Sequence, residues 1–336
     1  MTDVALEAGC SQATVSFVLN RAPGVKISAE TRARVIEAAL RLNYAPPSFA
    51  HLEPAEPRAD QSHPIGFLVD QLATSPEAVV AIDGARQAAW EAGRIVLTAQ
   101  TANDAEMERA PIRALTRQPL SGLIYMTIFT RKAEVPPELL ALGLPLVLLN
   151  CYDGEGRLPA VLPAETAGGR RATQTLIDHG HRRIGMITGE PWMEAARDRQ
   201  KGYRQALAAA GIAFDADLVR RGNWSASTGY DGTQALLSLD HPPTAIFCQN
   251  DRMAIGCYEA LKEAGLRIPE DMSVVGFDDE EISRHLHPRL TTLILPHRAM
   301  GGWAAKRLAS GGGAGEQVEL ECTLVARNSV AQPHPD

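Results

Sequence analysis

Beyond residue 63, short apolar runs alternate with stretches in which apolar residues recur every three or four positions. A run such as IGFLVD (65–70) is typical of a buried strand, whereas DRMAIGCYEALKEAG (251–265) has the period of an amphipathic helix. Apolar strands joined by helices are characteristic of doubly wound parallel sheets. The pattern therefore predicts an α/β core with two such sheets, which meet near Pro163.

The predicted elements of this core follow one another in a regular order. Strands are expected at 65–70, 94–100, 121–126, 144–150, 182–189, 244–249 and 272–279, with a closing strand pair over 318–330. Helices are expected at 77–93, 106–118, 165–181, 196–211, 227–239 and 251–265. The chain is expected to cross between the two sheets again near TTLILP (291–296) and after Leu308.

The first 44 residues have a different pattern, which predicts three short helices with a tight turn between the first two. Gly9 and Cys10 form the turn, and Ser11 and Ser28 are placed to cap the second and third helices. Apolar positions of the third helix are expected to pack against Val4, Ala5 and Val15; they are Ile27, Val35, Ile36, Ala39, Leu40 and Leu42.

The second helix also carries a stripe of hydroxyl and amide side chains: Ser11, Gln12, Thr14, Ser16 and Asn20. Such groups near a helix N-terminus suit phosphate oxygens and the base edges of a DNA major groove. A three-helix bundle that binds nothing would leave this stripe unexplained.

Charge modifies this interpretation. The 336-residue chain has a formal charge of -7 and a pI near 5.8, which alone would argue against nucleic-acid binding. Residues 1–47, however, carry a net charge of +1, so the acidity lies in the larger remainder. Because this first region is only weakly basic, a single copy should bind DNA weakly, and dimerisation should matter.

The five cysteines are scattered without metal-ligand spacing and are expected to be free thiols in a reducing compartment. No basic-then-apolar leader opens the chain, and no apolar run reaches membrane-spanning length. We therefore expect a soluble cytoplasmic protein without a cofactor, a metal or a membrane partner.

Three sequence motifs distinguish the N-terminal region from a generic three-helix unit: DVA-x-x-AG, S-x-ATVS-x-VLN and SAETR-x-RV-x-EAA-x-x-x-NY. The region resembles the helix-turn-helix domain of the lactose-repressor/galactose-repressor (LacI/GalR) family of bacterial regulators. The resemblance implies an all-α helix-turn-helix headpiece joined to the α/β core. The residues expected at DNA are Ser11, Gln12, Ala13, Thr14, Ser16, Phe17, Asn20, Thr31 and Leu52. Phe17 replaces an arginine that commonly reads guanine, which suggests a different preferred operator.

Residues 45–64 are rich in proline, alanine and charge and are a linker by composition. In the family this region forms a hinge helix on DNA, and a leucine inserts into the minor groove. Here Pro47 replaces the usual asparagine, His51 replaces the arginine, and Leu52 falls one residue early. These departures and the additional prolines predict weak or absent intercalation, although Leu52 remains its only candidate.

Further words, such as GHRRIGMI, FCQNDRMAIG and IPEDMSVVGFDD, make the core resemble the type I periplasmic-binding-protein fold. The implied organisation is a DNA-binding domain over 1–45, a hinge or linker over 46–63 and an effector-binding and dimerisation core over 64–330. Within the core, lobe one is expected at about 64–163 and 296–310, and lobe two at about 164–292 and 316–330.

Ligands of such folds bind between the lobes, at the carboxyl ends of the strands. The resemblance implies that Arg199 forks onto sugar hydroxyls, that Asn250 contacts ligand and that Trp224 stacks on a sugar ring. Asp278 follows a predicted strand and can accept from two hydroxyls. The effector-binding candidates are Asp70, Ser75, Asn150, Arg199, Trp224, Asn250 and Asp278. Asn150 could instead satisfy loop backbone, and Asp251 and Asp279 could be helix caps.

The leading interpretation is a sequence-specific transcriptional regulator, acting as a repressor, whose operator affinity is controlled by a small sugar-like ligand. A homodimer would place two recognition helices on a pseudo-palindromic operator. The alternative is a solute-binding protein of a transport system. An enzyme is not expected, because no G-x-G-x-x-G follows the first strand and no Walker loop or G-x-S-x-G occurs. His179 and His181 resemble a metal pair, but in the family this segment is a helix-to-strand corner.

Overall fold

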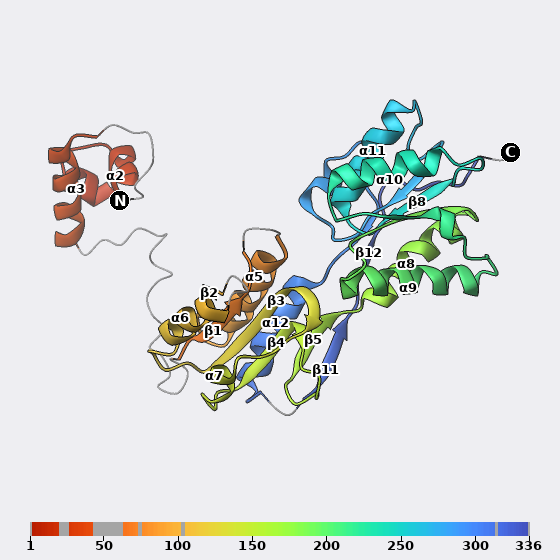
Figure 1. The fold of residues 1–336 in the computed structure, drawn as a ribbon. Helices are drawn as coiled ribbons and strands as arrows, with labels where there is room; N and C mark the ends of the chain where they lie inside the picture. Colours follow the sequence, from red (N-terminus) through yellow and green to blue (C-terminus); the bar gives the residue numbers. More distant parts are fainter. Residues whose placement is uncertain are drawn as a thin grey trace. The chain divides into compact units, whose positions relative to one another are not determined.

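The computed structural model of the chain describes residues 2–19, 27–42, 63–72, 76–101, 105–312 and 315–334. The chain divides at residue 60 into two compact units, which we name the headpiece and the core (Figure 1). In the described part of the chain, no helix has both the length and the apolar character needed to cross a bilayer.

The headpiece consists of three helices, α1 (Thr2–Glu7), α2 (Gln12–Leu19) and α3 (Ala29–Arg41). The hydroxyl oxygens of Ser11 and Ser28 accept hydrogen bonds from the amides of Thr14 and Thr31, both at 3.1 Å, so each serine caps its helix as predicted. The helices enclose a small core of Val4, Ala5, Ala8, Val15, Val18, Val35, Ala38 and Ala39. Ile36 and Leu42, which were expected in this core, are exposed, because the inward face of α3 is formed by positions 35, 38 and 39.

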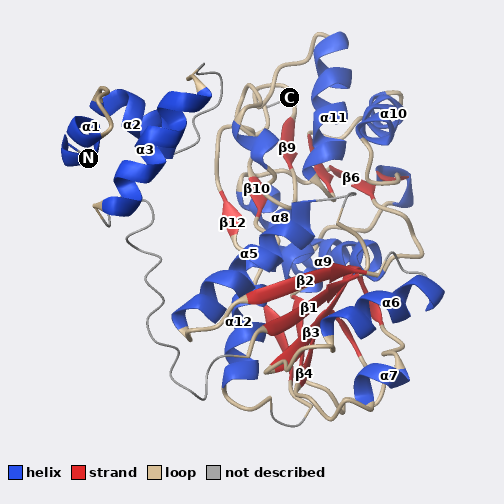
Figure 2. Ribbon diagram, turned by 90° about the vertical axis from the view of Figure 1, so that its left-hand side faces the viewer, coloured by secondary structure: helices blue, strands red, loops and turns tan. Residues whose placement is uncertain are grey.

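Lobe one of the core contains a six-stranded parallel sheet in the order β11-β5-β4-β3-β1-β2. Its strands are β1 (Ile65–Val69), β2 (Val96–Gln100), β3 (Gly122–Lys132), β4 (Leu146–Tyr152), β5 (Ala160–Pro163) and β11 (Gln317–Leu320). Four helices flank it: α5 (Pro76–Glu91), α6 (Ala105–Leu115), α7 (Pro137–Leu140) and α12 (His297–Ala309). Figure 2 shows α5 and α12 on one face of the sheet and α6 and α7 on the other.

Successive side chains of each strand point to opposite faces of this sheet, so each face packs against a different pair of helices. Phe67 and Val69 pack with α5 and α12, whereas Leu68 packs with residues of α6 and α7. Both sets are fully buried, so the strands appear in the sequence as continuous apolar runs rather than as alternating patterns.

Lobe two contains a four-stranded parallel sheet in the order β7-β6-β8-β9. Its elements are α8 (Glu165–Asp178), β6 (Ile184–Thr188), α9 (Glu194–Ala209), a 3-10 turn (Ala216–Leu218), β7 (Val219–Arg221), α10 (Ala226–Leu237), β8 (Ala245–Cys248), α11 (Asp251–Glu263), β9 (Ser273–Val275) and a second 3-10 turn (Glu281–Arg284). One apolar cluster joins the sheet to α8 and α9, and another joins it to α10 and α11. The predicted doubly wound, two-lobed core is thus confirmed.

The chain passes between the lobes three times: after β5, before α12 and after β11 (Figure 1). The expected assignment of 316–330 to lobe two is wrong for β11, which pairs with β5 of lobe one. The expected closing strand pair is also corrected. β12 (Leu324–Val325) pairs with β10 (Thr292–Leu293) instead, because the chain changes lobe between β11 and β12.

Glycine allows the two helices that cover lobe one to touch along their backbones. A Cβ atom added to Gly301 of α12 would lie 1.9 Å from the carbonyl oxygen of Ala81 in α5. Conversely, a Cβ on Gly84 of α5 would lie 2.0 Å from the carbonyl oxygen of Arg298. Both atoms are backbone, so neither contact can be relieved by a side-chain movement.

This contact predicts opposite effects for two adjacent glycines. Gly301→Ala should lower the free energy of unfolding by about 1–3 kcal/mol, since overpacking outweighs the gain in helix propensity. Gly302→Ala is the control, because its added Cβ would meet only ordinary contacts, the nearest at 3.7 Å. It should stabilise the protein by about 0.5–1 kcal/mol. Urea unfolding of both variants measures the difference, and equal effects would contradict the backbone contact.

Candidate functional site

The headpiece presents the N-terminal half of α2 to solvent. Ser11, Gln12, Ala13 and Phe17 are exposed, while Thr14 and Ser16 are half-buried between this surface and the core. The Phe17 ring is 41% exposed, although a phenyl group in a three-helix unit would ordinarily be buried. The surface therefore combines one amide, small groups and an accessible ring, which suits contact with base edges and a thymine methyl.

At the start of α2 two hydroxyl groups pair with each other, and the same occurs at the start of α3. The Ser11 and Thr14 hydroxyls lie 2.9 Å apart, and Ser28 donates to the Thr31 hydroxyl at 2.8 Å. These pairs fix the first turns of α2 and α3. Arg41 is engaged by Glu7 and Glu37, so its charge is partly compensated within the headpiece. Three expected residues, Asn20, Leu52 and Ser75, lie outside the described part of the chain.

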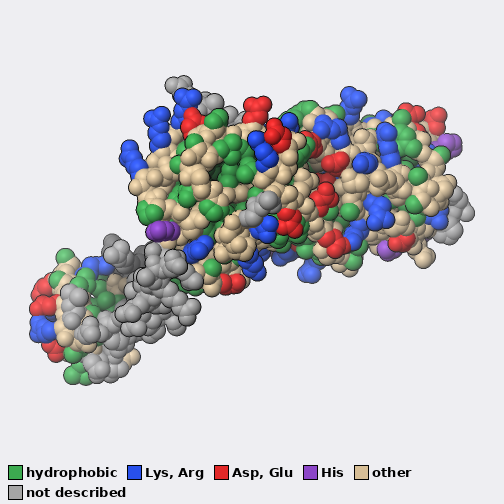
Figure 3. Space-filling view, turned by 90° about the horizontal axis from the view of Figure 1, so that it is seen from below, with side chains coloured by type: hydrophobic (Ala, Val, Ile, Leu, Met, Phe, Trp, Pro, Cys, Tyr) green, Lys and Arg blue, Asp and Glu red, His purple; other side chains and the backbone are tan. Residues whose placement is uncertain are grey.

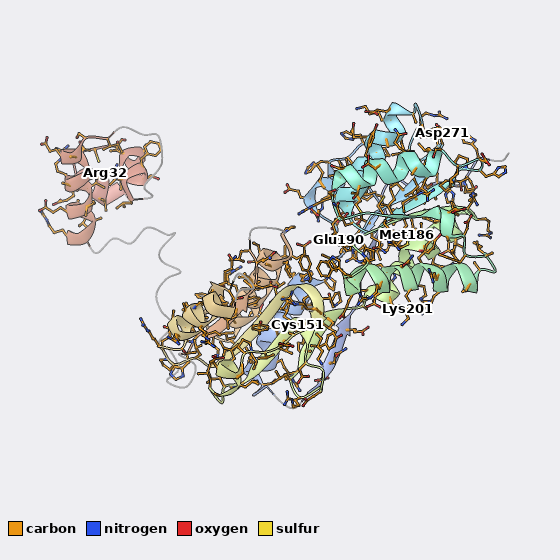
Figure 4. The ribbon with its side chains drawn as sticks, in the orientation of Figure 1. Arg32, Cys151, Met186, Glu190, Lys201 and Asp271 are labelled. Carbon is orange, nitrogen blue, oxygen red and sulfur yellow. The ribbon has the colours of Figure 1, made fainter. Side chains whose placement is uncertain are left out.

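A cavity of about 300 Å³ lies between the two lobes, at the carboxyl ends of strands from both sheets. Five predicted effector residues line it: Asn150, Arg199, Trp224, Asn250 and Asp278. The other lining residues are Glu77, Ile128, Phe129, Thr130, Glu165, Glu190, Met193, Ala195, Asn223, Arg252, Glu280, Leu295 and His297. Figure 4 labels Glu190 at this junction and marks the two sheets by Cys151 in lobe one and Met186 in lobe two.

Arg199 is the central cation of the cavity and is almost fully buried. Its Nε and Nη2 atoms donate to the two carboxylate oxygens of Glu165, at 2.6 and 3.0 Å. Nη1 donates to the Gln249 carbonyl and lies 3.4 Å from Asp278 Oδ1. Burial alone would lower the pKa of Arg199, but the two carboxylates outweigh it and raise that pKa above its usual value. Arg199 thus holds the cavity together, and most of its donors are occupied.

The two predicted asparagines line the cavity, but their amides mainly fix its loops. Asn150 donates to the carbonyls of Thr127 and Ile128, both at 3.0 Å, and accepts from the Thr130 hydroxyl at 2.7 Å. Asn250 accepts from the Met253 amide at 2.9 Å and so caps α11, while its Nδ2 donates to the Trp224 carbonyl. Each asparagine keeps limited capacity for a ligand.

Backbone strain is concentrated at this cavity. Asn150, Trp224 and Asp278 line it and have φ angles of 58°, 68° and 107°, a region that residues other than glycine rarely adopt. The only other described non-glycine residue with positive φ is the adjacent Asp279. Such strain costs of order 1–3 kcal/mol at each residue and typically occurs at binding sites.

One sequence expectation changes in the structure, and another fits it. Asp70 is not on the cavity wall, because its carboxylate turns toward β3 and accepts from the amides of Ile128 and Gln71, with Arg131 also paired to it. Burial raises the pKa of this carboxyl, although these contacts oppose the shift. His181 bridges the Thr244 hydroxyl and the Ala331 carbonyl, which fits the expected structural corner.

Sequence reasoning found Asp278 but missed the other four carboxylates of the cavity, Glu77, Glu165, Glu190 and Glu280, and its histidine. Glu280 lies two residues beyond Asp278, and Glu165 begins the first helix after a crossover, so both positions could have been suspected. Glu77, Asp278 and Glu280 each offer one oxygen within 4.8 Å of the others, a spacing that a cation could bridge. His297 begins α12 and is 2% exposed. Burial, and then the charge of Arg199, lower the pKa of this imidazole to about 3, so it is neutral.

Comparisons with known proteins agree with this architecture. Residues 1–47 match the family model for bacterial regulatory proteins of the lacI family, and residues 173–330 match that of a periplasmic binding protein-like domain. The chain is 33% identical to the ribose operon repressor of Haemophilus influenzae over 335 residues, which cover 98% of each protein. It is 32% identical to the transcriptional repressor PurR of Pasteurella multocida over 98% of this chain and 97% of that relative.

Solved structures with the same fold include complexes with ligand and with DNA. A transcriptional regulator CelR–cellobiose complex superposes with a TM-score of 0.67 at 29% identity, covering 97% of this chain and 98% of that one. The lac repressor dimer bound to operator and the anti-inducer ONPF gives the same TM-score and identity and covers 98% of both chains.

The buried pair of Arg199 and Glu165 leads to a stability prediction. Arg199→Met should lower the free energy of unfolding by about 3–5 kcal/mol, because Glu165 would remain buried without its partner. The double variant Arg199→Met, Glu165→Leu removes both charges and should recover most of that loss. Arg267→Met, which breaks an exposed pair with Asp271, is the control and should unfold close to the native midpoint. A double variant as unstable as Arg199→Met would refute this account.

Proposed function

This chain belongs to the lacI family of bacterial regulatory proteins, and from this premise we propose that it works as a homodimeric repressor controlled by a sugar-like effector. Its relatives over nearly the whole chain are repressors, so it is a ligand-controlled transcriptional regulator rather than a solute-binding protein of a transport system. Members of this family are transcriptional repressors and not enzymes, and we extend that to this chain. The proposed partner is double-stranded operator DNA, which places the protein in the cytoplasm.

The interlobe cavity carries the effector proposal. It collects five of the predicted residues from both lobes, and three of them are held in strained backbone conformations. Its volume lies at the lower end of ligand pockets, roughly 300–1,000 Å³, and so fits a monosaccharide-sized molecule. The Trp224 ring offers an apolar face, and Asp278, Glu190 and Asn223 offer acceptors for hydroxyl groups.

Control by a ligand requires the lobes to move relative to one another. Contacts between the lobes include a polar one and an edge-on one: the Tyr152 hydroxyl lies 3.2 Å from Glu194 Oε1, and the centres of the Phe129 and Trp192 rings lie 5.9 Å apart. A ligand that touches both lobes stabilises one of their arrangements by its differential affinity. Because the headpiece is attached to lobe one, such a shift would reach the DNA-binding unit.

The core also has a surface suited to a second copy. Val79 and Trp90 of α5 are 57% and 64% exposed, and Ile95, just before β2, is 54% exposed. Val79 and Trp90 are separated by about three helical turns, so they share one side of α5, and apolar groups gathered on one side of a helix suit a protein interface. On the face of the core seen in Figure 3, acidic and basic side chains are interspersed, which leaves no broad cationic surface there for DNA. We assign DNA binding to paired headpieces, because the exposed polar surface of α2 lies there.

A ligand screen tests the effector proposal. Hexoses and pentoses should raise the melting temperature of the full chain in a concentration-dependent way, because a ligand that binds only the native state stabilises it. Asp278→Asn should weaken the best sugar tenfold to a hundredfold, the value of about 1.5–3 kcal/mol for a charged hydrogen bond. Asp271→Asn, which changes a half-buried aspartate far from the cavity, is the matched control (Figure 4). Equal sugar affinity in the two variants would remove Asp278 from the site.

A selection from random duplexes tests the DNA proposal. The native chain should return a palindromic site, and Gln12→Ala should relax the preference at one base pair of each half-site, at a cost of ~1–3 kcal/mol. The exposed Gln205 of α9, changed to alanine, is the control and should leave the selected sequence unchanged. Recovery of unrelated sequences by the native chain would overturn the proposal, and an unaltered site for Gln12→Ala would remove Gln12 from base readout.

A further inference from the structure

Carboxyl groups from both lobes meet at one wall of the interlobe cavity. Glu77 lies in the first turn of α5 in lobe one, whereas Asp278 and Glu280 follow β9 in lobe two. One oxygen of each lies within 4.8 Å of the others. Like charges at this spacing repel across the boundary between the lobes.

The cations that line the cavity neutralise this wall only in part. Arg199 is held bidentately by Glu165 and also by the Gln249 carbonyl, and its distance to Asp278 is 3.4 Å. Arg252 is paired with Glu280, at 2.9 and 3.2 Å. Among the described residues, five carboxyl groups and two guanidinium groups line the cavity, and no lysine does. The cavity is therefore acidic even after its internal ion pairs form.

Two groups at this site also lack hydrogen-bond partners within the described protein. One is Oε2 of Glu77, and the other is the His297 imidazole, of which both ring nitrogens are buried and unpartnered. A neutral imidazole has one N–H donor and one acceptor nitrogen. His297 can therefore donate a hydrogen bond to a ligand hydroxyl group or accept one from it. Leaving such groups unsatisfied is costly, which points to a ligand that brings hydrogen-bonding groups to them.

We propose that the effector carries a protonated amine in addition to hydroxyl groups, as an amino sugar or a similar polyhydroxylated amine does. The ammonium group lies between Glu77, Asp278 and Glu280, and its three N–H donors match three carboxylates. This inference rests on the proposed function, in which the cavity takes a sugar-like effector, and it names the chemical class of that effector.

The position of the carboxylates connects this chemistry to regulation. An ammonium group between these carboxylates would replace repulsion between the lobes by attraction to both. The amine itself would therefore favour the arrangement in which the two lobes lie close together around it. A neutral sugar leaves the repulsion in place, and a phosphate ester adds to it. Burial is the largest cause that raises the pKa values of the Asp278 and Glu280 carboxyls; Arg199 and Arg252 oppose the two shifts, and the charge of Glu77 adds to both.

A bare divalent cation is a different occupant of the same wall. Carboxylate oxygens are suitable ligands for it. The cavity, however, continues past these oxygens to the Trp224 ring and to the orphan nitrogens of His297. An ion would leave both without a partner, whereas an organic amine would occupy the whole cavity.

Calorimetry on the full chain tests the inference with matched pairs of probes. Glucosamine, galactosamine and mannosamine are compared with glucose, galactose and mannose and with the corresponding N-acetyl sugars, which lack the charge. At least one amine should bind about tenfold to a hundredfold more tightly than both of its neutral counterparts. Glu77→Gln keeps the shape but removes a charge, and it should cost that amine at least tenfold. Glu91→Gln, at the exposed far end of α5, should keep its native affinity.

Each of the remaining outcomes would contradict the inference and would show which part of it is wrong. If neutral sugars bind as tightly as the corresponding amino sugars, the proposal of a protonated amine is wrong, but the proposal of a sugar-like effector is retained. If no sugar or amine binds, both proposals fail. If Mg²⁺ or Ca²⁺ alone raises the melting temperature and the amines do not, the wall is a metal site. An amine preference that survives in Glu77→Gln, with the variant folded by its melting curve, places the ammonium elsewhere.

Discussion

The ion pair between Arg199 and Glu165 is the interaction on which the rest of the core depends. Glu165 begins α8 directly after the first crossover, Arg199 lies in α9, and the same guanidinium reaches the end of β8 through the Gln249 carbonyl. It also lies over the Phe277 ring, 3.7 Å from the ring centre. A buried charge must be paired, so these elements can occupy only positions that keep the guanidinium satisfied.

This constraint explains why the cavity combines a rigid floor with an adaptable wall. The floor consists of groups whose hydrogen bonds are mostly made within the protein: Arg199 with Glu165, and the amides of Asn150 and Asn250 with the backbone. The wall of Glu77, Asp278 and Glu280 spans the two lobes and is only partly compensated. Ligand selectivity therefore depends on the wall, while the floor keeps the strand ends in register.

The sequence predicted the layers of the core because buried strands and amphipathic helices leave different periods in a chain. It also placed Asp278 at the cavity, since residues after parallel strands meet at one edge, whereas the family resemblance placed Arg199 and Trp224 there. It failed at Asp70, which follows a strand but turns away from the cavity. Asn150 and Asn250 line the cavity as predicted, and their amides also bind backbone groups, an alternative that the sequence left open for Asn150. Positive φ at Trp224 and the pairing of a strand as short as β11 leave no mark in residue type alone.

The three passages between the lobes have a consequence for synthesis on the ribosome. Lobe one begins at β1, but α12, which covers one face of its sheet, and β11, which closes its edge, come from the last 40 residues of the chain. Until these residues emerge, the face that buries Phe67 and Ile124 lacks half of its cover. The nascent chain thus carries an apolar surface through the translation of most of lobe two. Such long-range closure slows folding and makes the growing polypeptide a substrate for chaperones.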